Sequence, residues 1–258
     1  MRTAIRFAYD GTRFGGYPPA EGRRTVEGAL LDALREQVPS AVLRSGSRTD
    51  RGVSAVANVA LVESDRAIDP RRLAAGLEDI WITGVATVGA SFRPRLADWR
   101  WYRYHLVERS LDPVLASRCA DLFVGTHDFR NFARVDARDT RRTVLRSEVN
   151  AMDDRPVVTL DIVGRSFLWR MVRRIAAAVE AVGTGNASVD ELREALERSG
   201  TRRTFGTAPP EPLVLMKVRY GGLVFEDVGP SKAAVRRARG VLGEAMARAT
   251  VAGDIVGR

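Results

Sequence analysis

The sequence predicts an α/β (α+β) fold in which two similar halves share one mixed, mainly antiparallel sheet. Short segments of alternating apolar and polar residues, typical of half-buried strands, are separated by amphipathic segments with helical periodicity. In the first half their order is close to the split β-α-β arrangement of ferredoxin-like units, and the second half contains similar elements. No linker rich in Pro, Gly or Ser separates the halves, so we expect a continuous sheet.

The first half opens with a strand at 2–9, in which Ile5, Phe7 and Tyr9 share one face. Thr25 can cap a helix whose apolar stripe runs to Val38. The other expected elements are a strand at 57–62, a helix opened by Asp69-Pro70 and carrying Leu73, Leu77 and Ile80, and strands at 81–89 and 99–107.

In the second half, Ser188 and Glu191 form a capping box at the start of one expected helix. The expected elements are strands at 142–149, 156–163 and 213–220 and helices at 165–182, 189–199 and 231–249. We divide the chain into an N-terminal segment, 1–108, and a C-terminal segment, 109–258.

The charge balance favours a polyanionic partner. Lys and Arg total 41 against 32 Asp and Glu, which gives a net charge of +9. Most of the positive charge is arginine, whose planar fork can grip two phosphate oxygens and also stack on bases. Arginine-rich composition also follows from GC-rich coding, so charge alone leaves both interpretations open.

Cysteine and histidine usage predicts a protein that needs no metal. The single cysteine, Cys119, excludes an intrachain disulfide and a multi-cysteine zinc site, and it fits a reducing cytoplasm. His105 and His127 are far apart in sequence and complete no recognisable ligand set. The sequence shows no signal peptide and no transmembrane segment, so we expect a cytoplasmic protein without a membrane partner.

Asp50 lies in the segment SGSRTDRGVSA, between Arg48 and Arg51. Taken alone, an aspartate in such a turn usually bonds nearby amides or pairs with arginine. Five other segments change this balance: YDGTRFGGY at 9–17, SFRPRLADWRWYRYHL at 91–106, GTHDFRNFAR at 125–134, GRSFLWRMVRR at 164–174 and APPEPLVL at 208–215. In this order and spacing, the chain resembles the tRNA pseudouridine synthase A family (TruA) over nearly its whole length.

The resemblance implies an isomerase that converts uridine to pseudouridine in tRNA without a cofactor. It also implies two RRM-like halves that meet in a basic central cleft, with helices on the opposite face. Asp50 falls on the family aspartate in Arg-Thr-Asp-x-Gly-Val and becomes the nucleophile. Arg173 falls on its partner arginine, and Tyr102 on a tyrosine that stacks on the base and can transfer a proton. Leu213 would line the uracil pocket.

Each of these residues also has a structural interpretation. Arg173 fits the surface of an amphipathic helix, Tyr102 fits an aromatic strand, and Leu213 fits a core strand. Five arginines in or beside the matched segments are candidates for phosphate contacts: Arg13, Arg48, Arg51, Arg170 and Arg174.

The family's substrate is uridine in the tRNA anticodon stem-loop, at tRNA positions 38 to 40, and the base must be flipped out before it reacts. The resemblance also implies a homodimer. Two other interpretations stay open: a synthase for another RNA or another site, and a non-catalytic RNA-binding module in which Asp50 only anchors a loop. Ser47, Ser54, Tyr17-Pro18 and Pro212 depart from the commonest family residues, but none removes a group needed for the chemistry.

Overall fold

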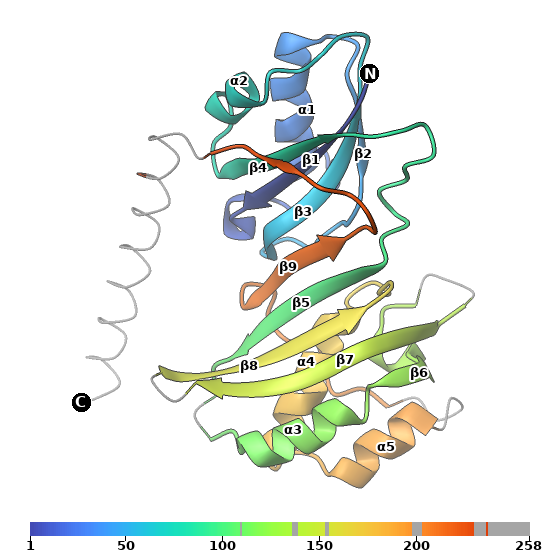
Figure 1. Ribbon diagram of the computed structural model, residues 1–258. Coiled ribbons are helices and arrows are strands. Elements are labelled where there is room, and N and C mark those ends of the chain that lie inside the picture. The colour runs from blue at the N-terminus through green and yellow to red at the C-terminus, as the bar shows by residue number, and fades with distance from the viewer. Residues whose placement is uncertain (109, 136–138, 153–154, 198–202, 230–235, 237–258) are drawn as a thin grey trace, which may run out of the picture.

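The computed structural model describes residues 1–108, 110–135, 139–152, 155–197, 203–229 and 236 (Figure 1). Its strands are β1 (Arg2–Tyr9), β2 (Val42–Ser45), β3 (Ser54–Glu63), β4 (Ile80–Thr87), β5 (Trp99–Leu106), β6 (Gly125–Asp128), β7 (Arg141–Met152), β8 (Arg155–Gly164), β9 (Leu213–Arg219) and β10 (Glu226–Asp227). Its helices are α1 (Val26–Gln37), α2 (Pro70–Ala75), α3 (Pro113–Asp121), α4 (Met171–Gly183) and α5 (Val189–Glu197), with the 3-10 turns η1 (Gly11–Arg13) and η2 (Arg130–Phe132).

The described strands form one ten-stranded sheet, in the order β10-β4-β1-β3-β9-β5-β8-β7-β6, with β2 paired to β3. Every described strand pair is antiparallel except β3 and β9, so the prediction of a mixed, mainly antiparallel sheet is confirmed. None of the described helices is both long enough and apolar enough to span a bilayer.

Two sets of strands repeat the same order within this sheet. The first set runs β4-β1-β3-β2 and the second β9-β5-β8-β7, which is the ferredoxin-like order of fourth, first, third and second strand. By strand order β5 belongs to the second set. The sets join where β9 pairs with β3 over Ser54↔Val214 and Ala55↔Leu215. Because both sets lie in one sheet, the division of the chain into segments 1–108 and 109–258 stays a prediction.

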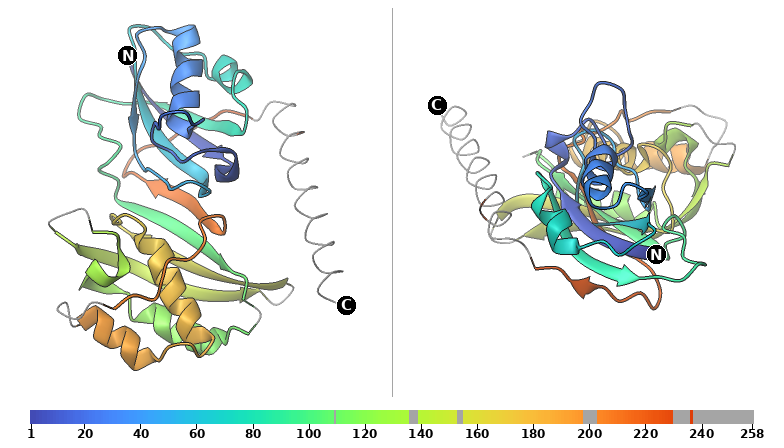
Figure 2. Two further views of the ribbon diagram at one scale, coloured as in Figure 1. Left: turned by 180° about the vertical axis from the view of Figure 1, so that it is seen from behind. Right: turned by 90° about the horizontal axis from the view of Figure 1, so that it is seen from above.

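The helices cover one face of the sheet, and α1 and α4 both lie in front of it in the left view of Figure 2. Thr25 caps α1 as expected, because its hydroxyl accepts a hydrogen bond from the Gly28 amide at 3.2 Å. Leu30 and Leu34 are fully buried, and burial of each leucine stabilises the fold by roughly 1.5–3 kcal/mol. In α4 the same stripe spacing buries Ile175, Val179 and Val182.

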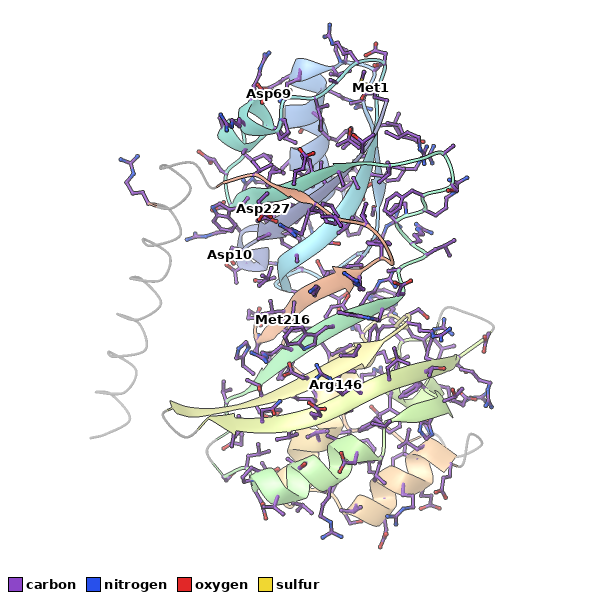
Figure 3. The ribbon with its side chains drawn as sticks, in the orientation of Figure 1. Met1, Asp10, Asp69, Arg146, Met216 and Asp227 are labelled. Carbon is purple, nitrogen blue, oxygen red and sulfur yellow. The ribbon has the colours of Figure 1, made fainter. Side chains whose placement is uncertain are left out.

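The second predicted helix is shorter than expected. Asp69 caps α2 by accepting hydrogen bonds from the amides of Arg71 and Arg72, and it is labelled in Figure 3. The helix ends at Ala75, before Gly76. Leu77 therefore lies outside the helix, although it is buried, and Ile80 begins β4. Leu77 and Ile80 have helical spacing from Leu73 and are buried as expected, but Leu77 follows the helix and Ile80 belongs to a strand.

The fourth helix begins at Met171 rather than near 165. Arg170 has a φ of 61°, in the left-handed region, which breaks helical geometry before that residue. The elements β2, α3, β6 and β10 were not predicted. The capping box of α5 is confirmed, since Ser188 and Glu191 exchange two hydrogen bonds. The helix expected at 231–249 falls almost entirely outside the described residues.

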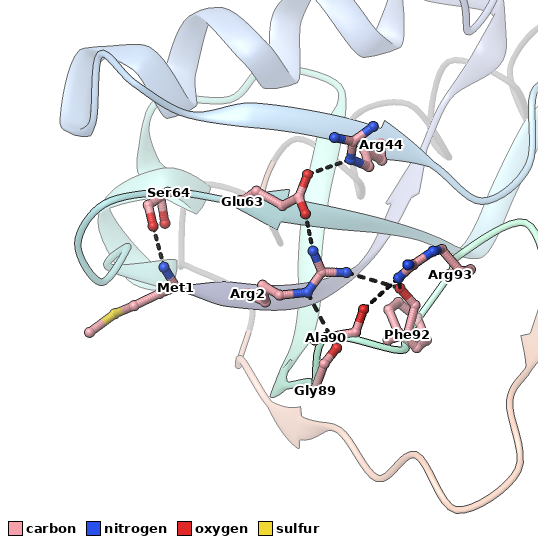
Figure 4. A network of polar contacts seen from close by, with 9 residues as sticks. All are labelled: Met1, Arg2, Arg44, Glu63, Ser64, Gly89, Ala90, Phe92 and Arg93. Carbon is pink, nitrogen blue, oxygen red and sulfur yellow. Dashed lines mark hydrogen bonds and ion pairs between the residues drawn. The ribbon is translucent and has the colours of Figure 1, made fainter.

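A polar network ties the start of β1 to its neighbours (Figure 4). Glu63 at the end of β3 pairs with both Arg2 and Arg44, which joins three adjacent strands. Arg2 also donates to the Phe92 carbonyl at 3.0 Å and to the Gly89 carbonyl at 3.3 Å. These bonds fasten the connection between β4 and β5 against the first strand set.

Candidate active site

A cavity of about 760 Å³ opens between the two strand sets. Segments far apart in sequence line it: the loop after β2, strand β5, the loop before α4, and the first turn of α4. Its only acidic lining residue in the described chain is Asp50, whereas the lining arginines are Arg48, Arg51, Arg95, Arg100, Arg142, Arg170 and Arg173. The cavity therefore presents a concentrated positive field around one carboxylate.

Both oxygens of Asp50 accept hydrogen bonds from the second half of the chain. Trp169 donates its indole N–H to Oδ1 at 2.9 Å, and Arg173 donates from Nη1 to Oδ2 at 2.9 Å. Arg173 is itself aimed by a 2.8 Å bond from its Nε to the Ala208 carbonyl. Charge-assisted bonds of this kind fix the orientation of a carboxylate.

The backbone of the Asp50 loop is fixed by hydrogen bonds at Thr49, and it requires a glycine at position 52. The Tyr17 amide donates to the Thr49 carbonyl at 3.1 Å, and the Thr49 hydroxyl lies 2.8 Å from the Tyr9 hydroxyl. Gly52 has a φ of 88°, and a Cβ added there would lie 2.9 Å from Pro210 Cγ. Only glycine fits this position without strain, which is the physical reason for the glycine two residues after Asp50.

Arg100 ties three loops around the cavity. This buried guanidinium donates to the Ser47 hydroxyl at 2.9 Å and to the carbonyls of Gly46, Arg95 and Arg165 at 3.2, 2.9 and 2.6 Å. None of these partners is a carboxylate. Arg100 was not among the predicted site residues, although its position two residues before Tyr102, on the same buried face of β5, was a usable signal.

Tyr102 and Leu213 form the apolar part of the lining. The Tyr102 ring meets Phe167 edge-on, with ring centroids 5.2 Å apart. Burial raises the pKa of Tyr102 to about 12; the positive charge of Arg100 acts in the opposite direction, and the negative charge of Asp50 adds to the rise. The phenol is therefore protonated near neutral pH. Leu213 begins β9, is paired with Tyr104 of β5, and is buried.

Comparison with known proteins supplies the activity. A family model described as tRNA pseudouridine synthase matches residues 119–221. The tRNA pseudouridine synthase A of Pyrococcus abyssi is 42% identical over 230 residues, covering 87% of each chain. That of Thermococcus onnurineus is 37% identical over 270 residues, covering 99% of each. The chain belongs to the tRNA pseudouridine synthase A family. It is an isomerase that acts on tRNA, and the predicted family is confirmed.

Among solved structures, an H/ACA RNP bound to a substrate RNA containing 2′-deoxyuridine is 15% identical to this synthase. The match covers 69% of the synthase and 43% of that chain, with a TM-score of 0.36.

The cleft opens on the helical side of the sheet, which differs from the expected arrangement with helices on the opposite face. Met171, Val172 and Arg173 line the cavity, so the start of α4 forms one of its walls. On β5, Arg100 and Tyr102 share the face that packs toward α4. The synthase thus places its pocket between the start of α4 and the loops of the first half rather than on the bare sheet.

The structure brings together only some of the arginines predicted to contact phosphate. Arg48, Arg51 and Arg170 line the cavity. Arg13 and Arg174 do not line it, and the Nε of Arg13 lies 3.8 Å from an oxygen of Asp10. Contacts of all five with RNA stay predictions.

Sequence reasoning missed Trp169, which contacts Asp50 directly. Its ring is flanked by guanidinium groups, with Arg134 at 4.3 Å and Arg170 at 5.3 Å from the ring centroid. The residue stands within the matched segment GRSFLWRMVRR. The expected helix from 165 placed Trp169 inside a helix. In the structure the left-handed Arg170 ends a loop before α4, and Trp169 lies in this loop, which lines the cavity. A tryptophan among arginines in a matched segment was the available signal.

Proposed function

We propose that this synthase converts uridine to pseudouridine in the tRNA anticodon stem-loop, at tRNA positions 38 to 40, with Asp50 as the nucleophile. The observation that carries the proposal is the double grip on Asp50 by Trp169 and Arg173 inside an arginine-lined cavity. A carboxylate held in this way is aimed at whatever occupies the cavity. The volume of about 760 Å³ lies in the range of small-molecule sites and admits a single flipped nucleotide.

The reaction breaks the bond between ribose C1′ and uracil N1 and forms a bond between C1′ and C5. N1 takes up a proton and C5 loses one, so atoms and charge balance without an external reactant. Asp50 can serve by adding to the base ring, by adding to C1′, or by removing the ribose 2′ hydrogen to give a glycal. In all three routes one oxygen of Asp50 must face the ribose or the base.

Tyr102 and Leu213 support the proposal as the apolar floor for the flipped uracil. Tyr102 offers a ring for stacking and, as a protonated phenol, a proton donor beside Asp50. Arg48, Arg51 and Arg170 stand around the same cavity, where phosphates flanking the flipped nucleotide would enter. Arg13 and Arg174 would contact phosphates farther along the stem.

The test compares wild type with Asp50→Asn on tRNA labelled at uridine. The amide keeps the shape of the side chain but is a far weaker nucleophile, so we expect pseudouridine formation to be lost while tRNA affinity is kept. Full activity of Asp50→Asn would refute the nucleophile. Mapping the product with anticodon stem-loops that carry one uridine at position 38, 39 or 40 tests the site, and product elsewhere would refute that part alone.

We further propose that the synthase is a cytoplasmic homodimer. The family resemblance supports the dimer, and the single, buried Cys119 is consistent with a reducing compartment. Sedimentation equilibrium of the full chain tests the first part, and a monomer at micromolar concentration would contradict it. Cell fractionation tests the second part.

A further inference from the structure

We propose that Trp169 is a positioning residue for the reaction, and that its indole N–H fixes the orientation of Asp50. The inference rests on the proposed role of Asp50 as nucleophile. Trp169 donates to Oδ1 at 2.9 Å, whereas Arg173 donates to Oδ2. With only one of these bonds, the carboxylate could rotate about its Cβ–Cγ bond. With both, the plane of the carboxylate is fixed.

The two donors form one unit. Trp169 and Arg173 lie on either side of the left-handed Arg170, at the loop and the first turn of α4. Asp50 is 119 and 123 residues away from them in sequence, in the first half of the chain. The grip therefore exists only when the two halves are in register, so the turn at 169–173 aims a side chain supplied by the other strand set.

Trp169 is held in place by more than its bond to Asp50. Arg134 stacks over its ring at 4.3 Å, and the Arg134 amide donates to the Trp169 carbonyl at 2.9 Å. Trp169 nevertheless stays 40% exposed at the cavity wall. A tryptophan that served only the core would be buried, and this one is fixed at the surface with its single polar atom on the proposed nucleophile.

The test is Trp169→Phe, which keeps an aromatic ring between the guanidinium groups and removes the N–H. A hydrogen bond to a charged group contributes enough for its loss to slow the reaction by about tenfold to a hundredfold. We expect this fall in the single-turnover rate at saturating enzyme. We expect tRNA affinity to change by less than about threefold, because the proposed role of the N–H is to orient Asp50 and not to bind the tRNA.

Trp101→Phe is the matched control. Its indole N–H also donates to a carboxylate, Asp161 Oδ1 at 2.8 Å, but Trp101 does not line the cavity. The proposal predicts an unchanged rate for this variant. Wild-type activity of Trp169→Phe, or weakened tRNA binding with an unchanged single-turnover rate, would overturn the proposal. Neither result bears on the activity of Asp50→Asn, which tests the proposed nucleophile separately.

A spectroscopic test avoids any folding defect of Trp169→Phe. The chain has four tryptophans, so the wild type should show four indole N–H resonances in a ¹⁵N-labelled sample. An amide oxygen is a weaker acceptor than a carboxylate. In Asp50→Asn we therefore expect one of these four resonances to move upfield while the other three stay in place. If all four coincide with the wild type, the contact and the proposal are wrong.

Discussion

Breaking the pair between Asp50 and Arg173 should reveal a direct energetic link between the two halves of the synthase. Arg173→Met removes the bonds to Asp50 and to the Ala208 carbonyl, and Asp50→Ala removes the bonds from Arg173 and Trp169. Each bond involves a charged group, and such bonds contribute about 1.5–3 kcal/mol. The side chains are 12% and 23% exposed, so solvent screens the pair only in part. We expect each single variant to lose roughly 2–4 kcal/mol of unfolding free energy.

The double variant distinguishes a real pair from two independent losses. If the two side chains stabilise each other, the double variant loses less than the sum of the singles, by about 1–2 kcal/mol. Urea unfolding of the four proteins measures this coupling. The surface pair Arg193–Asp190, 47% and 89% exposed, is the control and should give a coupling near zero. Additive losses at Asp50 and Arg173 would refute the pairing on which the site is built.

Three further predictions concern stability and RNA binding. Arg100→Lys should cost about 1–3 kcal/mol of unfolding free energy in urea, because an ammonium group cannot bond Ser47 and three carbonyls at once; an unchanged midpoint would contradict the role of Arg100. Burial raises the pKa of Tyr102 and of Tyr104 to about 12, above the value of 10.0 for a free phenol. From about pH 10 to 12 the unfolded chain holds fewer of these protons, so the unfolding free energy should fall by up to roughly 3 kcal/mol per tyrosine, and a flat profile between pH 9 and 11 would contradict this. The tRNA affinity should fall steeply from about 50 to 200 mM salt, and Arg48→Gln should reduce the slope of log affinity against log salt by about 1 if Arg48 contacts a phosphate.

The strands were the more predictable part of this fold. Alternation in 2–9 and 99–107 identified β1 and β5, because each strand has one face in the core. The short strands β2 and β6 were not predicted, because four residues each are too few for an alternating pattern to be recognised. The starts of helices followed caps where the side chain made the bond, as at Thr25 and Asp69. They failed at Arg170, where a backbone angle that no propensity indicates sets the boundary.

Only the site residues that fall on the matched family motifs were predicted from the sequence. Asp50, Arg173, Tyr102 and Leu213 all line one cavity, although nothing in local spacing brings residues so distant in sequence together. The contact of Trp169 depends on the conformation of one loop, and the network of Arg100 depends on carbonyls in three loops. Backbone carbonyls have no sequence signature, so the partners of Arg100 could not be named before the fold was known, although its place two residues before Tyr102 marked it as a candidate.

The junction between the strand sets explains why the site lies where it does. Only two residue pairs join β3 to β9, beginning at Ser54, four residues after Asp50. At the same junction β9 begins with Leu213, and β5 beside it carries Tyr102 and Arg100 (Figure 1). A short parallel contact fixes little by itself, since each pair adds few backbone bonds. The bonds from Trp169, Arg173 and Arg100 to the loop at 46–50 are therefore both the arrangement of the site and part of what holds the halves in register, so a substitution that loosens the junction should weaken catalysis and stability together.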